Sequence, residues 1–447
     1  MNKMERYNSV IGVRYGAPLL SVVWSPQNKI QTMRDLWIQL ALIQKELGIE
    51  SIMDEGIEEM RMNQNNIDYD LIERYEKKYK HDIMAHIHAY GDICPKAKSF
   101  IHLGVTSNFI NDNSDSILIK RSFDVIKQKL DILFDTLKRR SLEYKDEPTL
   151  AYTHFQRAQL ITVGKRFTMW NSDILLLIEN LRDNLKIPFR GVKGTVGSED
   201  TILKLFKGNH EKCKLINKLL SDHYGFDDYL KITGQTYSRL YDVFIFQHIS
   251  SISQTLYKIM NDIRLLMSKM EIQESFSSQQ IGSSAMPYKM NPITCEKICS
   301  ITRYLMNLET SMNQTYMNQW LERSLDDSAL KRIILPEAFL LLEHVLDESI
   351  RVIDKLVIHE KVIEREVETH FQHIISENII VKGVEMGYDR QELHERIRQI
   401  LIYKNADYNK DDILREIIEK NDIMMEDINK GEYIGRCVEQ IEEFYKL

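Results

Sequence analysis

Long stretches of helical periodicity constrain the fold of this chain more than any other feature. Between residues 241 and 270, apolar side chains recur at steps of three and four positions for about eight helical turns. Residues 117–142 and 160–185 repeat the pattern, and the 447 residues include only 18 Gly and 8 Pro that could interrupt helices. A long coiled coil is the weaker alternative, because strict heptads are absent. The sequence therefore predicts an all-α protein with a central long-helix bundle.

Changes in this pattern suggest three domains. Shorter helical pieces and turn residues such as Gly91 and Pro95 occupy the first part of the chain, and the last part is charge-rich and amphipathic. We therefore expect an N-terminal helical domain at 1–110, the central bundle at 111–358 and a C-terminal helical domain at 359–447. The bundle helices are longer than a small monomeric domain needs, which indicates that they also bury surface between subunits.

Charge and composition exclude several classes of protein. The net charge is −7 and hydrophobic residues make up 43% of the chain, as in a globular protein without general affinity for nucleic acid. No uncharged apolar run reaches the roughly 18 residues of a membrane span, and no secretory signal is visible. The cysteines, five in number, are an odd and sparse set that indicates reduced thiols. We therefore expect a cytoplasmic protein that binds neither nucleic acid nor membrane.

A polar loop interrupts the helical pattern at residues 283–292, where the sequence reads Ser-Ser-Ala-Met-Pro-Tyr-Lys-Met-Asn-Pro. Gly282, Pro287 and Pro292 argue against a helix there. Loops held between rigid elements often carry catalytic groups. The hydroxyl, ammonium and amide groups of this loop are therefore candidates for chemistry.

Histidines form a second group of candidates. His154 stands in a Thr-His-Phe-Gln segment, where a hydroxyl and an amide can fix its tautomer for acid–base work, although an isolated histidine is more often structural. His86 and His88 follow His81, but two positions apart on a helix they point in different directions. No metal site is therefore expected.

Arginines form a third group, in two distant parts of the chain. Arg323 and Arg332 flank a Leu-Asp-Asp-Ser segment, and Arg14 precedes a tyrosine near the N-terminus. Guanidinium groups bind phosphate through paired hydrogen bonds, so converging arginines would let an acidic protein take an anionic ligand. Surface ion pairing is the alternative, and spacing alone favours it.

Together these motifs resemble the adenylosuccinate lyase family of the fumarase/aspartase superfamily. The segment Gly-Ser-Ser-Ala-Met-Pro-Tyr-Lys at 282–289 is similar to the signature loop of the superfamily. Thr-His-Phe-Gln at 153–156, Gln-Thr-Tyr-Ser-Arg at 235–239 and Leu-Asp-Asp-Ser at 325–328 narrow the resemblance to this family. The resemblance implies a three-domain, fumarase/aspartase-like architecture.

The resemblance also implies an activity, the β-elimination of fumarate in purine biosynthesis. The substrates would be adenylosuccinate, which gives AMP, and succinylaminoimidazole carboxamide ribotide (SAICAR), which gives AICAR. No cofactor is implied, because protein groups would stabilise the carbanion. The family forms homotetramers in which each site combines segments of three subunits. An argininosuccinate lyase-like enzyme and a non-catalytic helical oligomer on the same scaffold are the alternatives.

The family pattern implies a role for each matching residue. Ser283 would be the base, His154 the proton donor and Glu296 the group that orients His154, while Lys289 would stabilise the Ser283 alkoxide and the substrate carboxylate. The implied substrate-binding residues, mostly hydroxyl-bearing or cationic, are Arg14, Tyr15, Lys80, His81, Asp82, Thr106, Ser107, Gln235, Asn291, Lys297, Arg323, Ser328 and Arg332.

Three positions depart from the family pattern. Arg157 stands where the family usually has a proline, and Met290 and Lys297 each replace an arginine. All three changes keep the proton-transfer residues. The last two reduce the number of guanidinium groups near the substrate, so the preference between the two substrates stays open.

Overall fold

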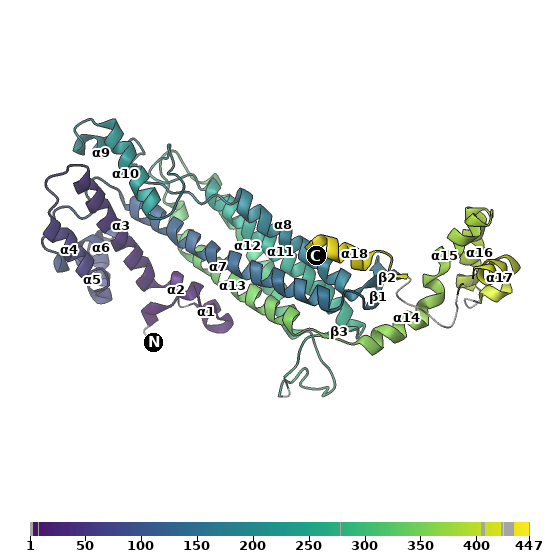
Figure 1. The fold of residues 1–447 in the computed structure, drawn as a ribbon. Helices are drawn as coiled ribbons and strands as arrows, with labels where there is room; N and C mark the ends of the chain where they lie inside the picture. The colour runs from purple at the N-terminus through teal and green to yellow at the C-terminus, as the bar shows by residue number, and fades with distance from the viewer. Residues whose placement is uncertain are drawn as a thin grey trace. The chain divides into compact units, whose positions relative to one another are not determined.

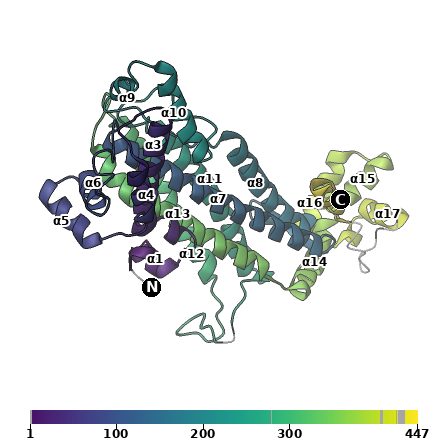
Figure 2. The same ribbon diagram turned by 60° about the vertical axis from the view of Figure 1, so that its left-hand side comes forward.

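The computed structural model describes residues 3–7, 9–277, 279–403, 407–421, 423 and 433–446. Helices make up most of these residues and the strands are short, so the predicted all-α class is confirmed (Figure 1, Figure 2). Among the helices described, none is long and apolar enough to cross a bilayer.

The chain divides into two compact units. The first comprises Met1–Asp131, Leu177–Tyr257 and Ile298–Glu348, and the second comprises Ile132–Leu176, Lys258–Lys297 and Ser349–Leu447. Five long helices contribute residues to both units: α7 (Ser107–Glu143), α8 (Val163–Asn184), α11 (Leu240–Ser268), α12 (Ile293–Met317) and α13 (Asp326–Asp354). Periodicity predicted the first three of them.

The domains expected at 1–110, 111–358 and 359–447 stay a prediction. Parts of them lie outside the described residues, namely residues 1, 2, 8, 278, 404–406, 422, 424–432 and 447.

Shorter helices complete the first unit. They are η1 (Lys3–Glu5), α1 (Val10–Tyr15), α2 (Leu20–Val23), α3 (Pro26–Glu46), α4 (Asp54–Met62), α5 (Tyr69–Tyr79), α6 (Asp82–Ile93), α9 (Asp200–Leu205) and α10 (His210–His223). Helix α3 begins where Ser25 accepts a hydrogen bond from the backbone N–H of Asn28 and Pro26 fills the first position, where its missing N–H costs nothing.

The core of the first unit explains how these helices hold together. Leu36 and Trp37 of α3 belong to one cluster of buried side chains with Tyr90 of α6, Phe109 of α7 and Ile216 of α10. Burying side chains of this size stabilises a fold by about 1.5–3 kcal/mol each relative to exposing them. This core therefore fixes the ends of α6 and α7, where several predicted binding residues lie.

The second unit contains the strands and the C-terminal helices. They are β1 (Pro148–Thr153), β2 (Gln156–Thr162), β3 (Ile272–Gln273), β4 (Val357–Ile358), α14 (Glu360–Ile374), α15 (Ser376–Glu385), α16 (Arg390–Tyr403), η2 (Tyr408–Lys410), α17 (Asp412–Lys420) and α18 (Cys437–Tyr445). Strand β1 pairs antiparallel with β2, and β3 pairs antiparallel with β4.

The β1–β2 hairpin carries a predicted catalytic residue. Thr153 pairs with Gln156, so His154 and Phe155 form a two-residue turn. From the sequence, His154 only precedes the helical pattern at residues 160–185, and no strand was predicted around it. The hairpin therefore adds a rigid support that the sequence did not predict.

Candidate active site

The predicted catalytic loop is fastened at its base by a buried carboxylate. It leaves β3 at Glu274 and ends at the start of α12. Glu274 is only 3% exposed, and its two carboxylate oxygens accept from the backbone N–H groups of Thr294 (3.1 Å) and Cys295 (2.7 Å). A carboxylate at a helix N-terminus satisfies unpaired N–H groups and complements the helix dipole. The two ends of the loop are therefore joined to each other.

Further along, the two arms of the loop run close together. The side-chain amide of Asn291 donates to the carbonyl of Gly282 at 2.9 Å. A Cβ atom at Gly282 would lie 2.2 Å from the carbonyl oxygen of Lys289, so only glycine permits this approach. The backbone of Lys289 therefore lies next to the residue that precedes Ser283.

The Ser283 hydroxyl faces backbone donors. Its Oγ accepts from the N–H of Met286 at 3.1 Å and, more weakly, from that of Ala285 at 3.4 Å. N–H groups aimed at an oxygen stabilise negative charge on it. Of the predicted residues, Ser283, Lys289 and Asn291 are thus brought together within one loop.

His154 occupies the tip of the β1–β2 hairpin, where its side chain is exposed. His154 and Phe155 both adopt positive φ angles, +51° and +60°, which residues other than glycine rarely do. The Nζ atom of Lys269 lies 4.8 Å from the ring centroid of Phe155 and 4.6 Å from that of Tyr152. The Tyr152 hydroxyl donates to the buried carboxylate of Glu271. These contacts hold the hairpin tip against the end of α11.

Glu296 has a different partner from the one expected. It lies in the first turn of α12, and its Oε1 is 3.9 Å from Nη2 of Arg264. In the described part of the chain, no hydrogen bond or ion pair joins Glu296 to His154. Lys297 follows Glu296 in the same helical turn.

Arg157, which stands at the family's proline position, lies on strand β2 opposite Tyr152. Its Nη2 is 3.1 Å from Oε2 of Glu366 in α14. Its side chain therefore ties the hairpin to the C-terminal helices of the second unit.

The first unit brings together several predicted binding residues at the ends of α6 and α7. His81 caps α6, since its Nδ1 accepts from the N–H of Met84 at 3.3 Å, and its Nε2 lies 3.5 Å from Oγ of Ser107. Nδ1 is therefore unprotonated, and Nε2 carries the proton that can point to Ser107. Asn108 donates to Oε1 of Gln235 at 3.3 Å.

Neighbouring residues complete this group. Lys80 ends α5 with a left-handed backbone, at a φ of 54°, and Thr106 directly precedes α7. The Lys-His-Asp, Thr-Ser and Gln-Thr-Tyr-Ser-Arg segments thus form one polar region of the first unit.

The arginines proposed to bind phosphate are already paired with carboxylates. Nη1 of Arg323 donates to Oδ1 of Asp327 at 2.8 Å, and Arg332 pairs with Asp82. Ser328 lines the same small cavity as Arg323 and Arg332.

Arg14 and Tyr15 form the end of α1, where Arg14 is exposed. The Tyr15 ring centroid lies 5.4 Å from that of His344 in α13.

A larger cavity of about 340 Å³ adjoins the same helices. Its lining combines the predicted residues Asp82 and Arg332 with Lys29, His86 and Lys331, which the sequence reasoning did not assign. A volume of this size is in the range of small-molecule sites. The sequence reasoning missed these lysines because no motif marks them. Their possible role becomes apparent only because the fold places them in the lining of this cavity.

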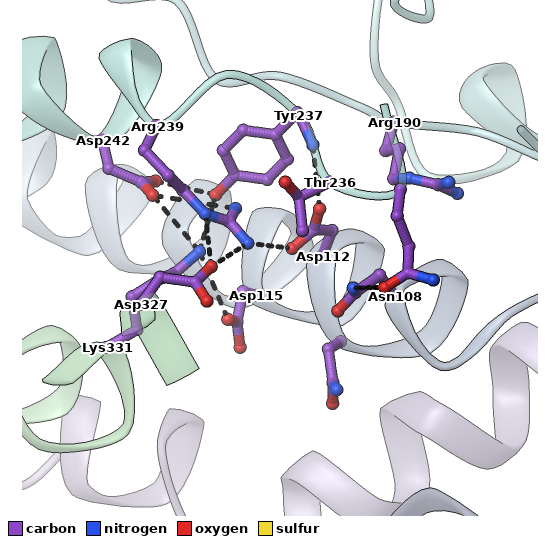
Figure 3. Close-up of polar contacts among 12 residues, drawn as sticks. Asn108, Asp112, Asp115, Arg190, Thr236, Tyr237, Arg239, Asp242, Asp327 and Lys331 are labelled. Atoms are coloured by element: carbon purple, nitrogen blue, oxygen red, sulfur yellow. Dashed lines mark hydrogen bonds and ion pairs between the residues drawn. The ribbon is translucent and has the colours of Figure 1, made fainter. Parts of the chain in front are cut away.

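The buried side chain of Arg239 joins the segments that form this region. The residue is 2% exposed, and its guanidinium donates from Nη2 to Oδ1 of Asp112 at 2.9 Å and from Nε to Oδ2 of Asp327 at 2.6 Å (Figure 3). Removing one partner of such a buried pair costs about 3–5 kcal/mol. The Gln-Thr-Tyr-Ser-Arg segment is thereby fixed to both α7 and α13.

Lys331 extends this network. Its Nζ donates to the Tyr237 hydroxyl at 3.0 Å and lies 3.2 Å from Oδ2 of Asp242 (Figure 3). Asp115 lies between Lys331 (3.7 Å) and Lys29 (3.3 Å). Burial alone would raise the pKa of Asp115, but the nearby Lys29 and Lys331 outweigh it and lower the pKa.

The cavity histidine is neutral. Burial lowers the pKa of His86 to about 4, although the nearby carboxylate of Asp82 opposes the shift. Burial likewise lowers the pKa of His102 to about 4, and the Nδ1 of His102 accepts from the Trp37 indole N–H at 3.0 Å. In the described residues, no cluster of three or more His, Cys, Asp or Glu side chains is arranged to hold a metal ion.

Comparison with known families and sequences gives a consistent result. A protein-family profile described as "Lyase" matches residues 32–306. A protein of Saccharomyces cerevisiae named adenylosuccinate lyase is 39% identical over 460 residues, covering 99% of this chain and 95% of the yeast protein. The protein of the same name from Schizosaccharomyces pombe is 40% identical over 457 residues, with coverage of 99% and 95%.

Solved structures share the fold at lower identity. A 3-carboxy-cis,cis-muconate lactonizing enzyme from Pseudomonas putida has a TM-score of 0.81 at 19% identity and covers 98% of each chain. A fumarate lyase from Mesorhizobium sp. BNC1 has a TM-score of 0.78 at 17% identity and covers 96% of this chain and 97% of its own.

The buried imidazoles predict that stability falls in mild acid. The unfolded chain takes up protons on His86 and His102 near pH 6.5, whereas the folded chain does so only near pH 4. Because the unfolded state then binds more protons, the free energy of unfolding should decrease as the pH falls between about 6.5 and about 4. Urea unfolding at several pH values measures this slope.

His102→Gln is the test variant, since its amide oxygen can still accept from Trp37 without titrating. It should flatten the slope, whereas His210→Gln, at an exposed position, should leave it unchanged. An unaltered slope in His102→Gln would contradict the assignment.

Proposed function

We propose that this chain, which belongs to the adenylosuccinate lyase family of the fumarase/aspartase superfamily, eliminates fumarate from adenylosuccinate to form AMP. The same chemistry on SAICAR would give AICAR and fumarate. Both reactions belong to purine biosynthesis. Near full-length similarity to relatives named adenylosuccinate lyase supports this proposal.

The environment of the Ser283 hydroxyl is the observation that carries the mechanism. A serine is a poor base unless its alkoxide is stabilised. Here backbone N–H groups point at Oγ, and the loop arm that carries Lys289 runs beside it. Peptide N–H donors favour the charged form, and the Lys289 ammonium would add to this effect if it turns toward Oγ in the assembled site. Ser283 is therefore suited to accept a proton from a weak carbon acid.

The elimination proceeds in two proton transfers. The Ser283 alkoxide takes the proton from the carbon next to a substrate carboxylate, and the electron pair moves onto that carboxylate. Lys289 and Asn291 stabilise this doubly charged intermediate. The electron pair then forms the C=C bond of fumarate as the C–N bond breaks. The departing nitrogen takes a proton from the His154 imidazolium. Before the next cycle Ser283 loses its proton to solvent and His154 takes one up from solvent, so both groups are restored.

Residues of the first unit would hold the rest of the substrate. Arg323, Ser328 and Arg332, with Arg14 and Tyr15, suit the phosphate because guanidinium and hydroxyl groups are its preferred donors. Residues 80–82, Thr106, Ser107 and Gln235 would bind the remaining polar groups.

The proposed assembly is a cytoplasmic homotetramer in which each site is built from several chains. The proton-transfer residues all belong to the second unit, and the phosphate-binding residues belong to the first. Lys297 would contact substrate from the first turn of α12, and Glu296 would orient the His154 of its site. An argininosuccinate lyase-like activity explains less, because its substrate has no phosphate for the arginines to bind.

The first test is turnover. Purified protein incubated with adenylosuccinate should release AMP and fumarate, detected by chromatography in equal amounts. Turnover of argininosuccinate without any cleavage of adenylosuccinate would contradict the proposal, and the absence of both activities would support a non-catalytic oligomer.

The second test removes the proton-transfer groups. Ser283→Ala and His154→Ala should each lower kcat by about 100-fold or more, because each removes an acid–base group. Ser284→Ala deletes the neighbouring hydroxyl and should retain the wild-type kcat. A near-normal rate in either main variant would exclude that residue from proton transfer.

The third test examines shared sites. Mixing inactive Ser283→Ala and His154→Ala proteins should restore part of the activity, because some sites then receive both intact residues from different chains. Subunit exchange can be followed with two differently tagged variants. Exchange without recovered activity would show that both residues of a site come from one chain.

A further inference from the structure

Asp327 occupies an unusual position between a buried arginine and a predicted phosphate-binding arginine. Its side chain is almost wholly buried, with 6% of the residue exposed. Oδ1 accepts from Nη1 of Arg323 at 2.8 Å, while Oδ2 accepts from Nε of Arg239 at 2.6 Å. One carboxylate therefore holds two guanidinium groups, one on each oxygen.

Arg239, the buried partner of Asp327, is itself held in place by other contacts. Its Nη2 donates to Asp112 (Figure 3). Its backbone N–H donates to Oε1 of Gln319 at 2.8 Å. The first contact ties it to α7, and the second ties it to the segment that follows α12. Because Arg239 cannot move without breaking buried pairs, Asp327 cannot move either.

Asp327 stays ionised in this position. Burial alone would raise its pKa, but the positive charges of Arg239, Arg323 and Lys331 outweigh it and lower the pKa. A charged carboxylate forms hydrogen bonds roughly twice as strong as a neutral one. The contact with Arg323 is therefore a firm one.

Arg323, the second arginine bound to Asp327, is accessible to a ligand. The Arg323 side chain is 22% exposed, and it lines a small cavity together with Ser328 and Arg332. Asp327 accepts one N–H of the Arg323 guanidinium, which carries several further N–H donors. Arg323 can therefore keep its contact with Asp327 while it binds an anion.

We propose that Asp327 is a positioning residue, which holds the guanidinium of Arg323 in the orientation that receives the substrate phosphate. The inference rests on the proposed function and adds to it a residue that does not itself touch substrate. A guanidinium that is already oriented loses less conformational freedom on binding. The opposite expectation is that Asp327 competes with phosphate for Arg323, in which case removing its charge would strengthen binding.

The test compares the two products as inhibitors, because AMP carries a phosphate and fumarate does not. In Asp327→Asn, the KM for adenylosuccinate and the inhibition constant of AMP should each rise about tenfold, because the guanidinium of Arg323 is no longer held in position. The inhibition constant of fumarate and kcat should change less than about threefold. A general loss of structure would instead shift both inhibition constants together.

Asp242→Asn is the matched control. Asp242 is also buried, and it lies 3.8 Å from Nη1 of the same Arg239, but among the described contacts none joins it to Arg323. This variant should lower the melting temperature without raising the inhibition constant of AMP relative to that of fumarate.

Asp327→Glu covers the case in which Asp327→Asn does not fold. It keeps the charge that Arg239 requires but moves the carboxylate by one methylene, so it too should weaken AMP selectively. Unchanged or tighter AMP inhibition in the folded variants would overturn the inference. Wild-type protein that does not cleave adenylosuccinate would instead overturn the proposed function.

Discussion

The guanidinium of Arg239 is buried in the first unit, and carboxylates from different segments must neutralise it. Burying an unpaired charge would cost several kcal/mol, so the chain folds only when these segments come together. The network is balanced, with the anions Asp112, Asp115, Asp242 and Asp327 facing the cations Lys29, Arg239, Arg323 and Lys331. Its members belong to α3, α7, α11, α13 and the segments that lead into the last two. Ser107, Gln235 and Ser328 lie within a few residues of these charges along the chain. The network therefore helps to fix the segments that carry these three predicted binding residues.

The second unit positions its residues by other means. Glu274 joins the two ends of the loop through backbone N–H groups of α12, and Asn291 joins the two arms. Beyond these contacts the side chains of Tyr288 and Met290 are exposed. Exposed segments open more readily than buried ones, so the loop can change conformation there while its ends stay fixed, as the proposed role of Ser283 would require. Most of the proposed binding residues thus lie in the first unit, and the proposed proton-transfer residues lie on a loop and a hairpin of the second.

The sequence predicted the parts of this structure that depend on local patterns. Apolar spacing marked α11, and glycine and proline marked the loop that carries Ser283, because both signals act within a few residues. The buried polar face of α7 could not be predicted in this way. No local pattern assigned Asp112 or Asp115 a buried role, because the partner of Asp112 lies 127 positions away in sequence. Charges of this kind become interpretable only when distant segments are placed together. The β1–β2 hairpin was also missed, because its turn lacks the Asn-Gly or Gly-Gly pair that usually marks such turns.

The absence of glycine or asparagine from the hairpin turn has a physical meaning for His154. A two-residue hairpin turn with positive φ at both positions normally selects glycine or asparagine, and other residues there cost of order 1–3 kcal/mol. His154 and Phe155 tolerate this conformation because the surrounding contacts hold it: the Lys269 ammonium lies over the Phe155 ring, and Tyr152 is bonded to Glu271. Strain of this kind persists where the structure around it is over-determined. The hairpin therefore exchanges local stability for a fixed backbone at His154, which would help the proposed proton donor reach a departing nitrogen.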